Sequence, residues 1–457
     1  MYLPADIWLL LPPHLIQTDI RALAGVCVTL RVLFRPLLGF KVTIMCGDCP
    51  KYALRKALVV TRTSTILDSV VEVNIGRTTN AYKDLRRSYK VPYLLTPTLF
   101  TLVNAIPAMR QLHSIHLNNI ILSRAYLYTI LSSPYLIHLI LRAVQMPKIR
   151  TFPPANLRKL TLTAMTSWET VQPLISQLAT SLECLVLQGC EFRTLPQLQL
   201  PSFPCLRELH LHQLYSARTF PDKSQLNELL SLGSQLTHLL LTGQPDYEPI
   251  TACQNSLQYL SINDGILSDQ IIRTVPFPRL MHLSIRILRF SYAVKHPLKR
   301  ALFIRDHFPK ITSLELHIPW FFRNIAVAIA RSQHNVQALK LTHETEIGIE
   351  YEEDVKACSC CQVETPHDEL HQAMSPMALQ TLTLEVTQFH RGLEGSAARC
   401  TRWVTNDIIP SATGLGGPGL MSIDMSVSRH KSGSIVRERV ISRRWVKVAD
   451  DDWQIVE

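Results

Sequence analysis

The 457-residue sequence predicts an α/β protein in which a strand and a helix alternate many times. A short apolar figure, with aliphatic residues at its first, fourth and sixth positions, recurs along the middle of the chain. Between Leu112 and Val336 its copies start 21 to 31 residues apart, and helical periodicity fills many of the intervals. A strand followed by a helix, repeated with its neighbours stacked, gives a parallel sheet that lines the concave side of a curved solenoid.

Composition allows a large core, because 47% of the residues are hydrophobic. The length fits two to four compact domains or one repeat array. A net charge of +11 permits an acidic partner without naming one, and the basic residues are spread widely, so we expect no nucleic-acid partner. The eleven cysteines are odd in number and show no paired spacing, which favours reduced thiols in the cytoplasm or nucleus.

The opening stretch LPADIWLLLPPHL, residues 3–15, raises the question of a targeting segment. Asp6 lies inside the apolar run, no basic residue precedes it, and Pro12 and Pro13 break it. A membrane span would need about 18 to 20 apolar residues. We therefore expect neither export nor a membrane span here.

Three short helices are expected in the first forty residues. Pro4 suits the first turn of a helix, and Pro12 ends that helix. Thr18 or Asp19 can cap a second helix, and a third apolar run, VTLRVLFRPLL, extends past Pro36. Three such helices enclose too little core to be stable alone. Their apolar residues therefore either bind a partner or simply cap the rest of the chain.

This stretch resembles an F-box over residues 1 to about 40. The resemblance lies in Leu3-Pro4, Ile7, Leu15, Asp19, the ALAGVC run ending at Cys27, Leu33 and Pro36-Leu37. Leu30 stands where many members have tryptophan, and Pro12 where a helix residue is usual. In that family the motif docks on the Skp-type adaptor of an SCF ubiquitin ligase. The resemblance implies that adaptor contacts come from Leu3, Pro4, Ile7, Leu10, Leu15, Leu23, Val26, Leu33 and Pro36.

A basic segment over residues 41–68 is expected to connect this module to a repeat region over residues 69–390. Helical spacing before two of the repeat figures is carried by Val171, Leu174, Ile175 and Leu178, and by Leu226, Leu229 and Leu230. The twelve figures start at residues 70, 112, 136, 157, 182, 206, 236, 257, 280, 311, 336 and 379.

The period is close to that of leucine-rich repeats, and the region resembles the repeats that often follow an F-box. The asparagine or cysteine ladder of regular repeats is mostly missing, so uneven turns and repeat lengths are expected. An unrelated α/β fold with several parallel strands is the alternative.

The same figure predicts which side chains face a partner. Its first, fourth and sixth positions go to the core, and its third, fifth and seventh positions point outward on the concave face. These side chains are either solvated polar residues or a ligand groove whose charge rises below about pH 6.5, where unperturbed imidazoles protonate. The candidate target-binding residues are His116, His138, Lys159, His210, His212, His238, Tyr259, His282 and His317, with Arg142, Arg286 and Glu315 among them.

Two cysteine clusters have spacings that could hold zinc. They are CGDC at 46–49, and Cys358, Cys360 and Cys361 with His367 nearby. Neither supplies four convincing ligands, so free thiols are favoured and no metal or cofactor is predicted. The second cluster lies in an acidic insertion, 343–378, that is expected to be an extruded loop.

The sequence lacks a nucleophile elbow, a Walker-type loop and a dinucleotide fingerprint, so no catalytic residue is assigned. Alternation over Leu420–Val456 predicts a small β cap within residues 391–457. The resemblance implies a non-catalytic substrate receptor, with the adaptor and cullin held through the N-terminus and a protein target held by the repeats. A repeat scaffold that binds a protein partner without any ligase is the alternative.

Overall fold

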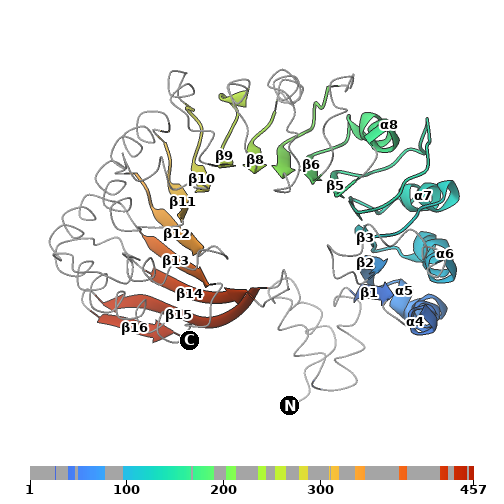
Figure 1. The fold of residues 1–457 in the computed structure, drawn as a ribbon, viewed down its shortest axis with the longest axis horizontal. Helices are drawn as coiled ribbons and strands as arrows, with labels where there is room; N and C mark the ends of the chain where they lie inside the picture. The colour runs from blue at the N-terminus through green and yellow to red at the C-terminus, as the bar shows by residue number, and fades with distance from the viewer. Residues whose placement is uncertain are drawn as a thin grey trace, which may run out of the picture. The chain divides into compact units, whose positions relative to one another are not determined.

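The computed structural model divides the chain into two compact units, residues 1–235 and 236–457. It describes sixteen strands and a smaller number of helices (Figure 1). The residues described are 26, 40–46, 50–77, 96–165, 168–189, 202–212, 235–242, 253–263, 277–286, 308, 310–318, 335–344, 380–388, 422–430, 437–449 and 452–456.

The first unit contains seven parallel strands in chain order. Each strand pairs with the next along the chain in a continuous register, apart from one irregularity at the start of β1. The strands are β1 (Phe40–Cys46), β2 (Val70–Arg77), β3 (Ser114–Asn118), β4 (His138–Arg142), β5 (Lys159–Thr163), β6 (Cys184–Gln188) and β7 (Glu208–His212).

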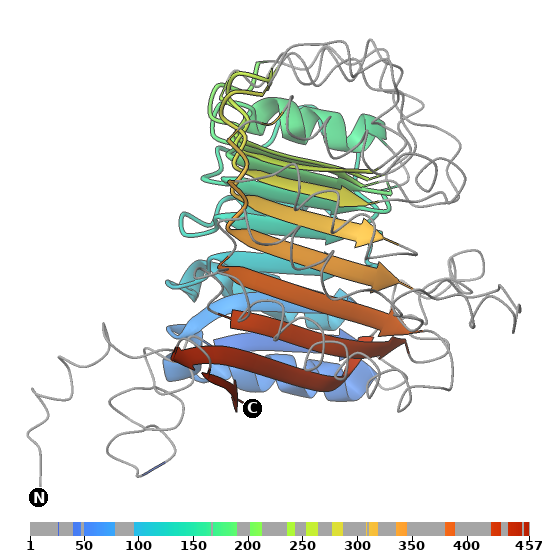
Figure 2. The same cartoon turned by 90° about the vertical axis from the view of Figure 1, so that its left-hand side faces the viewer.

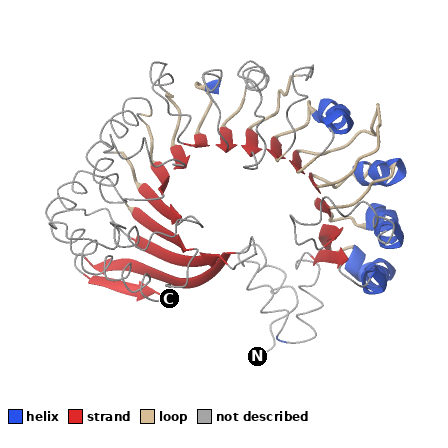
Figure 3. Cartoon of the chain, in the orientation of Figure 1, coloured by secondary structure: helices blue, strands red, loops and turns tan. Residues whose placement is uncertain are grey.

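Helices of the first unit lie on one side of these strands, the outer side in Figure 3. The helical spacing predicted for Val171, Leu174, Ile175 and Leu178 is confirmed, because all four are at most 2% exposed in α8. The Ser123 side chain caps α7 by accepting a hydrogen bond from the Tyr126 amide. The helices are α4 (Pro50–Arg62), α5 (Ser64–Leu67), α6 (Thr96–Ala105), the 3-10 turn η5 (Ile106–Ala108), α7 (Arg124–Leu131) and α8 (Trp168–Leu178).

The second unit continues the same pattern and ends differently. Strands β8 to β14 are parallel, whereas β15 pairs antiparallel with β14, and β16 pairs antiparallel with β15 (Figure 2). The strands are β8 (His238–Thr242), β9 (Tyr259–Asn263), β10 (His282–Arg286), β11 (Ser313–Ile318), β12 (Ala338–Glu344), β13 (Thr381–Gln388), β14 (Ser422–His430), β15 (Arg437–Ala449) and β16 (Asp452–Val456).

The core is formed by the predicted positions of the repeated figure. In β3, for example, Leu112 precedes the strand at the first position, and Ile115 and Leu117 occupy the fourth and sixth, all with no exposed surface. The same three positions are buried in every described copy from residue 70 to residue 316. Burying an aliphatic side chain contributes about 1.5 to 3 kcal/mol in gross transfer free energy. Burial of the apolar figure therefore stabilises both the alternation of buried and exposed side chains along each strand and the stacking of one strand on the next.

A left-handed residue follows four successive strands of the first unit. Asn119, Ala143, Ala164 and Gly189 have φ values between 50° and 59°. The backbone amide of each donates to the last carbonyl of the next strand, at 2.7 to 2.8 Å. The bend that turns the chain out of the sheet therefore also extends the hydrogen-bond ladder by one bond per repeat.

The parallel strands begin before residue 69, where the repeats were expected to start. Segment 41–68 is not only a connection, because it supplies most of β1 together with α4 and α5. Val42 and Ile44 are buried at the fourth and sixth positions of β1, but Gly39 stands at the first, so the sequence figure is incomplete. At the other end, β14 is still parallel to β13, and the parallel strands thus extend beyond residue 390.

The F-box-like stretch lies outside the described residues, except for Val26 and for Phe40, which begins β1. Val26 is helical and its side chain is 70% exposed. The predicted helix at Leu226, Leu229 and Leu230, most of the acidic insertion and its cysteine cluster also lie outside the described residues.

Candidate target-binding face

The third, fifth and seventh positions of the repeated figure form one face of the strands in each unit. We call this face the open face. The prediction that the candidate residues lie on the face away from the core is confirmed, because they alternate with the buried positions in β3 to β5 and in β7 to β10. Arg142 is exposed, and Arg286 and His317 are placed only by their positions in β10 and β11. The partly exposed candidates are His116, His138, Lys159, His210, His212, His238, Tyr259, His282 and Glu315.

Two histidines on adjacent strands of the first unit contact each other edge to face. The ring centroids of His116 and His138 are 6.0 Å apart. The His116 Nε2 atom lies 3.0 Å from Ser114 Oγ, and the His138 Nε2 atom lies 3.3 Å from Thr161 Oγ1. Burial lowers the pKa of His116, and burial together with the charge of Lys159 lowers the pKa of His138 to about 4. Both rings are therefore neutral at physiological pH.

A second histidine pair lies on β7. His210 and His212 are two residues apart on the same face of the strand, with ring centroids 6.2 Å apart. Burial, followed by the charge of His210, lowers the pKa of His212 to about 4. Neighbouring Cys184 on β6 is a free thiol, and its burial raises the thiol pKa to about 12. His212 and Cys184 are thus both uncharged at physiological pH.

Three rings form a stacked row across β8, β9 and β10 in the second unit. His238 stacks on Tyr259 with centroids 5.6 Å apart, and Tyr259 stacks on His282 at 4.4 Å with an interplanar angle of 5°. The parallel register places these residues directly opposite one another, at about the 4.8 Å spacing of neighbouring strands. Burial lowers the pKa of His282 and raises that of Tyr259. His282 and Tyr259 are therefore uncharged at physiological pH.

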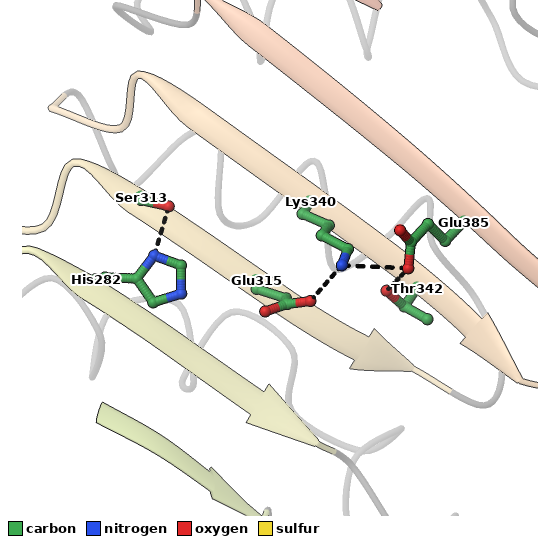
Figure 4. A network of polar contacts seen from close by, with 6 residues as sticks. All are labelled: His282, Ser313, Glu315, Lys340, Thr342 and Glu385. Carbon is green, nitrogen blue, oxygen red and sulfur yellow. Dashed lines mark hydrogen bonds and ion pairs between the residues drawn. The ribbon is translucent and has the colours of Figure 1, made fainter. Parts of the chain in front are cut away.

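A polar network continues from this row across β11 to β13 (Figure 4). The His282 Nδ1 atom lies 2.7 Å from Ser313 Oγ. Lys340 Nζ lies 2.8 Å from Glu315 Oε1 and 3.2 Å from Glu385 Oε2. Burial lowers the pKa of Lys340, but the hydrogen bond and charge of Glu315, followed by those of Glu385, outweigh burial and raise it. The lysine is thus charged and held between two carboxylates.

The open face carries little net charge in either unit. In β1 to β7, its three positions hold Lys41, Arg142 and Lys159 against Glu72 and Glu208, a balance of +1. In β8 to β14, the same positions hold two cations against three carboxylates, a balance of −1; these residues are Arg286, Lys340, Glu315, Glu385 and Asp424. Because the whole chain carries +11, its excess positive charge lies elsewhere.

The histidines of the open face do not have the pH response that the sequence predicted, because they are partly buried. Unperturbed imidazoles would charge below about pH 6.5, but burial lowers the pKa of His116, His138, His212 and His282. Burial acts this way because it penalises the charged form of a base. These four residues therefore become charged only below pH 6.5, and His138 and His212 only near pH 4.

Sequence reasoning missed the hydroxyl and ionic partners of the candidate residues. Ser313, Thr342 and Lys340 were not assigned to the site, although each occupies one of its three positions. The signal was available in the register, since residues at equal positions of successive figures become neighbours in a parallel sheet. Their chemical type, small hydroxyl or charged, decides whether the neighbouring histidine or carboxylate gains a hydrogen bond.

A comparison with models of known protein families finds no match, and a comparison with curated protein sequences finds none either. The fold itself, with its long and mostly parallel sheet, is compatible with an α/β solenoid-like protein. Among the helices that the structure describes, none combines the length and apolar character that crossing a bilayer requires.

Proposed function

We propose that this protein is the substrate-recognition subunit of an SCF-type ubiquitin ligase. In this function the F-box-like residues 1–40 dock on the Skp-type adaptor and thereby on the cullin, and the open face binds a protein target. The chain itself supplies no catalysis. It raises the effective concentration of the target at the enzyme that transfers ubiquitin, so that a bimolecular encounter becomes in effect intramolecular.

The observation that carries the target-binding half of the proposal is the chemistry of the open face. Most of its candidate residues are partly exposed, their charges nearly cancel, and the face contains many hydroxyl and imidazole groups together with the Tyr259 phenol. Binding of a polyanion would be favoured by a cluster of lysine and arginine residues. The open face has no such cluster, because carboxylates balance its cations. Hydrogen bonds to uncharged groups and the ring edges of Tyr259 and its neighbours suit a polypeptide segment with few charges.

The adaptor half rests on the F-box resemblance and on one physical argument. Association costs about 4 to 15 kcal/mol, whereas a buried aliphatic side chain contributes about 1.5 to 3 kcal/mol. A single helix would thus bind weakly. The apolar positions from Leu3 to Pro36 are distributed over three predicted helices, and together they would supply enough surface.

Affinity purification tests both halves. The full chain and a variant lacking residues 1–40 are purified in parallel, and the bound Skp-type adaptor and cullin are quantified. Both proteins are expected with the full chain and neither with the truncated one. A third variant, with His210, His212 and His238 replaced by alanine, is expected to keep the adaptor and to lose the target.

Two results would change the assignment. If an intact, folded full chain brings down no adaptor, the ligase function is wrong, and the protein is a repeat scaffold that binds a protein partner. If the alanine variant retains a target that the full chain binds, the open face at these histidines is not the binding site.

A further inference from the structure

The outer face of α4 is a second surface with a distinct chemistry. Six residues of this helix are exposed, and they span an arc of about 140° at about 100° per residue. On the other side of the helix, Ala53, Ala57 and Val60 are at most 7% exposed and form its inner face. The exposed residues, in order around the helix, are Lys51, Arg62, Arg55, Val59, Tyr52 and Lys56.

The charge of this surface is all of one sign. Helix α4 contains four lysine and arginine residues in its exposed arc and no acidic residue. Within the described part of the chain, no carboxylate lies within ion-pair distance of any of the four. Lys56 is held in place, because its Nζ atom donates to the Thr43 carbonyl at 2.7 Å. Part of the positive charge that the open face lacks is thus concentrated here.

An apolar stripe runs between these cations. Tyr52 is 69% exposed and Val59 is 61% exposed, and both lie on the same side of the helix, two turns or about 10.5 Å apart. Arg55 and Lys56 lie on either side of the line that joins them. Phe100, on neighbouring α6, is also 54% exposed. Exposed large apolar groups that are rimmed by charge mark interaction sites more often than a uniformly polar helix face does.

We propose that this α4 surface binds an acidic segment of a partner protein, with apolar side chains at its centre and carboxylates on either side. The apolar groups of the partner cover Tyr52 and Val59. Its carboxylates pair with Arg55, Arg62 and Lys51 on one side and with Lys56 on the other. This docking surface consists of residues other than those of the open face and of the F-box-like stretch, and its existence does not depend on the proposed ligase function.

The composition favours a protein segment over the two other anionic partners. A membrane-surface helix inserts a broad apolar face, but the inner face of α4 is buried, which leaves few side chains to insert. Non-specific binding of single-stranded nucleic acid uses several aromatic stacking platforms along a basic groove. Helix α4 offers one aromatic residue and an aliphatic one between its cations. Carboxylates around an apolar side chain match this arrangement best.

Selection from a display library of short random peptides on the full chain tests the proposal. The enriched peptides are expected to be acidic and to contain leucine, phenylalanine or tryptophan. An enriched peptide is then synthesised, and its affinity is measured at low and high salt. The charge-reversal variant Lys51→Glu/Arg55→Glu/Arg62→Glu is expected to weaken binding by at least about tenfold, with a smaller loss in high salt because exposed ion pairs are screened.

Two matched variants separate charge, apolar contact and general damage. Tyr52→Ser/Val59→Ser keeps every charge and is expected to weaken binding at both salt concentrations. The control Arg110→Glu/Arg150→Glu/Arg279→Glu changes the net charge by the same amount at exposed positions outside α4 and is expected to bind as the unchanged chain does. Circular dichroism and thermal unfolding of each variant report whether the fold is intact.

Several results would overturn the proposal. They are the absence of acidic peptides from the selected pool, equal binding by the charge-reversal variant, and equal loss in the control. Tighter binding of a single-stranded oligonucleotide or of phosphatidylserine vesicles through the same residues would assign the surface to that partner instead. The variant lacking residues 1–40 retains α4, so loss of adaptor binding and loss of peptide binding are separate results.

Discussion

At the residue scale, Ala143 and Ala164 show how the repeat geometry overrides local preference. Both have positive φ angles, which cost a residue with a Cβ atom about 1 to 2 kcal/mol. They remain in this conformation because the amide of each donates to the next strand. Glycine, which occupies the equivalent position at Gly189, tolerates it without strain.

Substitution of Ala143 tests this strain. We expect Ala143→Gly to leave the free energy of unfolding unchanged or raise it by up to about 1 kcal/mol, because relief of strain exceeds the chain entropy that glycine loses. Ala143→Val is expected to lower it, since a branched side chain fits this region poorly. Chemical denaturation measures both. Ala105→Gly is the control: its φ is −88°, so glycine should cost about 0.5 to 1 kcal/mol there. Equal effects at both alanines would contradict the explanation.

The buried histidines predict a loss of stability in mild acid. The pKa of His138 and that of His212 are about 4 in the folded chain, below the ordinary value of 6.5. Between these values the unfolded chain binds more protons, so the free energy of unfolding falls as the pH decreases from 6.5 towards 4.

Denaturation curves at a series of pH values, compared between the unchanged chain and His138→Gln/His212→Gln, measure this contribution. The variant is expected to show a shallower decline over the same interval. Exposed His113→Gln is the matched control and should keep the slope of the unchanged chain. An identical slope in the double variant would show that these two rings do not carry the acid response.

At the scale of elements, Gly76 governs how closely β2 approaches β3. A Cβ atom at Gly76 would lie 2.7 Å from Asn118 Cβ and 2.9 Å from the Asn118 carbonyl oxygen, closer than real contacts allow. We expect Gly76→Ala to lower the free energy of unfolding by about 1 to 3 kcal/mol through overpacking. Asn74→Ala, on the same face of β2, should change it by no more than about 0.5 kcal/mol. A Gly76→Ala variant as stable as the unchanged chain would show that the strands separate at little cost.

The elements also show what the sequence could predict. The recurring aliphatic residues, with their period-two spacing in each strand, were enough to predict the buried positions of β2 to β11. This is because the spacing of apolar residues depends directly on which side chains are buried. Strand β1 was missed since Gly39 replaces the first aliphatic residue. The lowered pKa of His138 could not be foreseen, because it depends on neighbours that come together only in the sheet. The sequence showed that the segment containing α4 is basic, but it did not show which side of this helix would be buried.

At the scale of the whole molecule, a stack of repeats transmits damage over a short range, because each repeat contacts mainly its neighbours. Leu160 has no exposed surface at the fourth position of β5. We expect Leu160→Ala to cost about 2 to 5 kcal/mol and to speed amide hydrogen exchange in β4 to β6 more than in β11 to β13. Mass spectrometry of peptides from the exchanged chain measures this. A uniform increase across all strands would indicate one cooperative unit.

From Asn119 to Gly189, the amide of each left-handed residue donates a hydrogen bond to the last carbonyl of the next strand. The end of each of these strands is therefore joined to the next repeat in the same way. The intervening intervals differ in length, being 24, 21 and 25 residues, yet the closing bond is unchanged. A gene duplication or deletion that adds or removes one such interval would leave the remaining junctions intact. The number of strands in the parallel sheet can therefore change by one at a time during evolution, while the connecting segments vary in length.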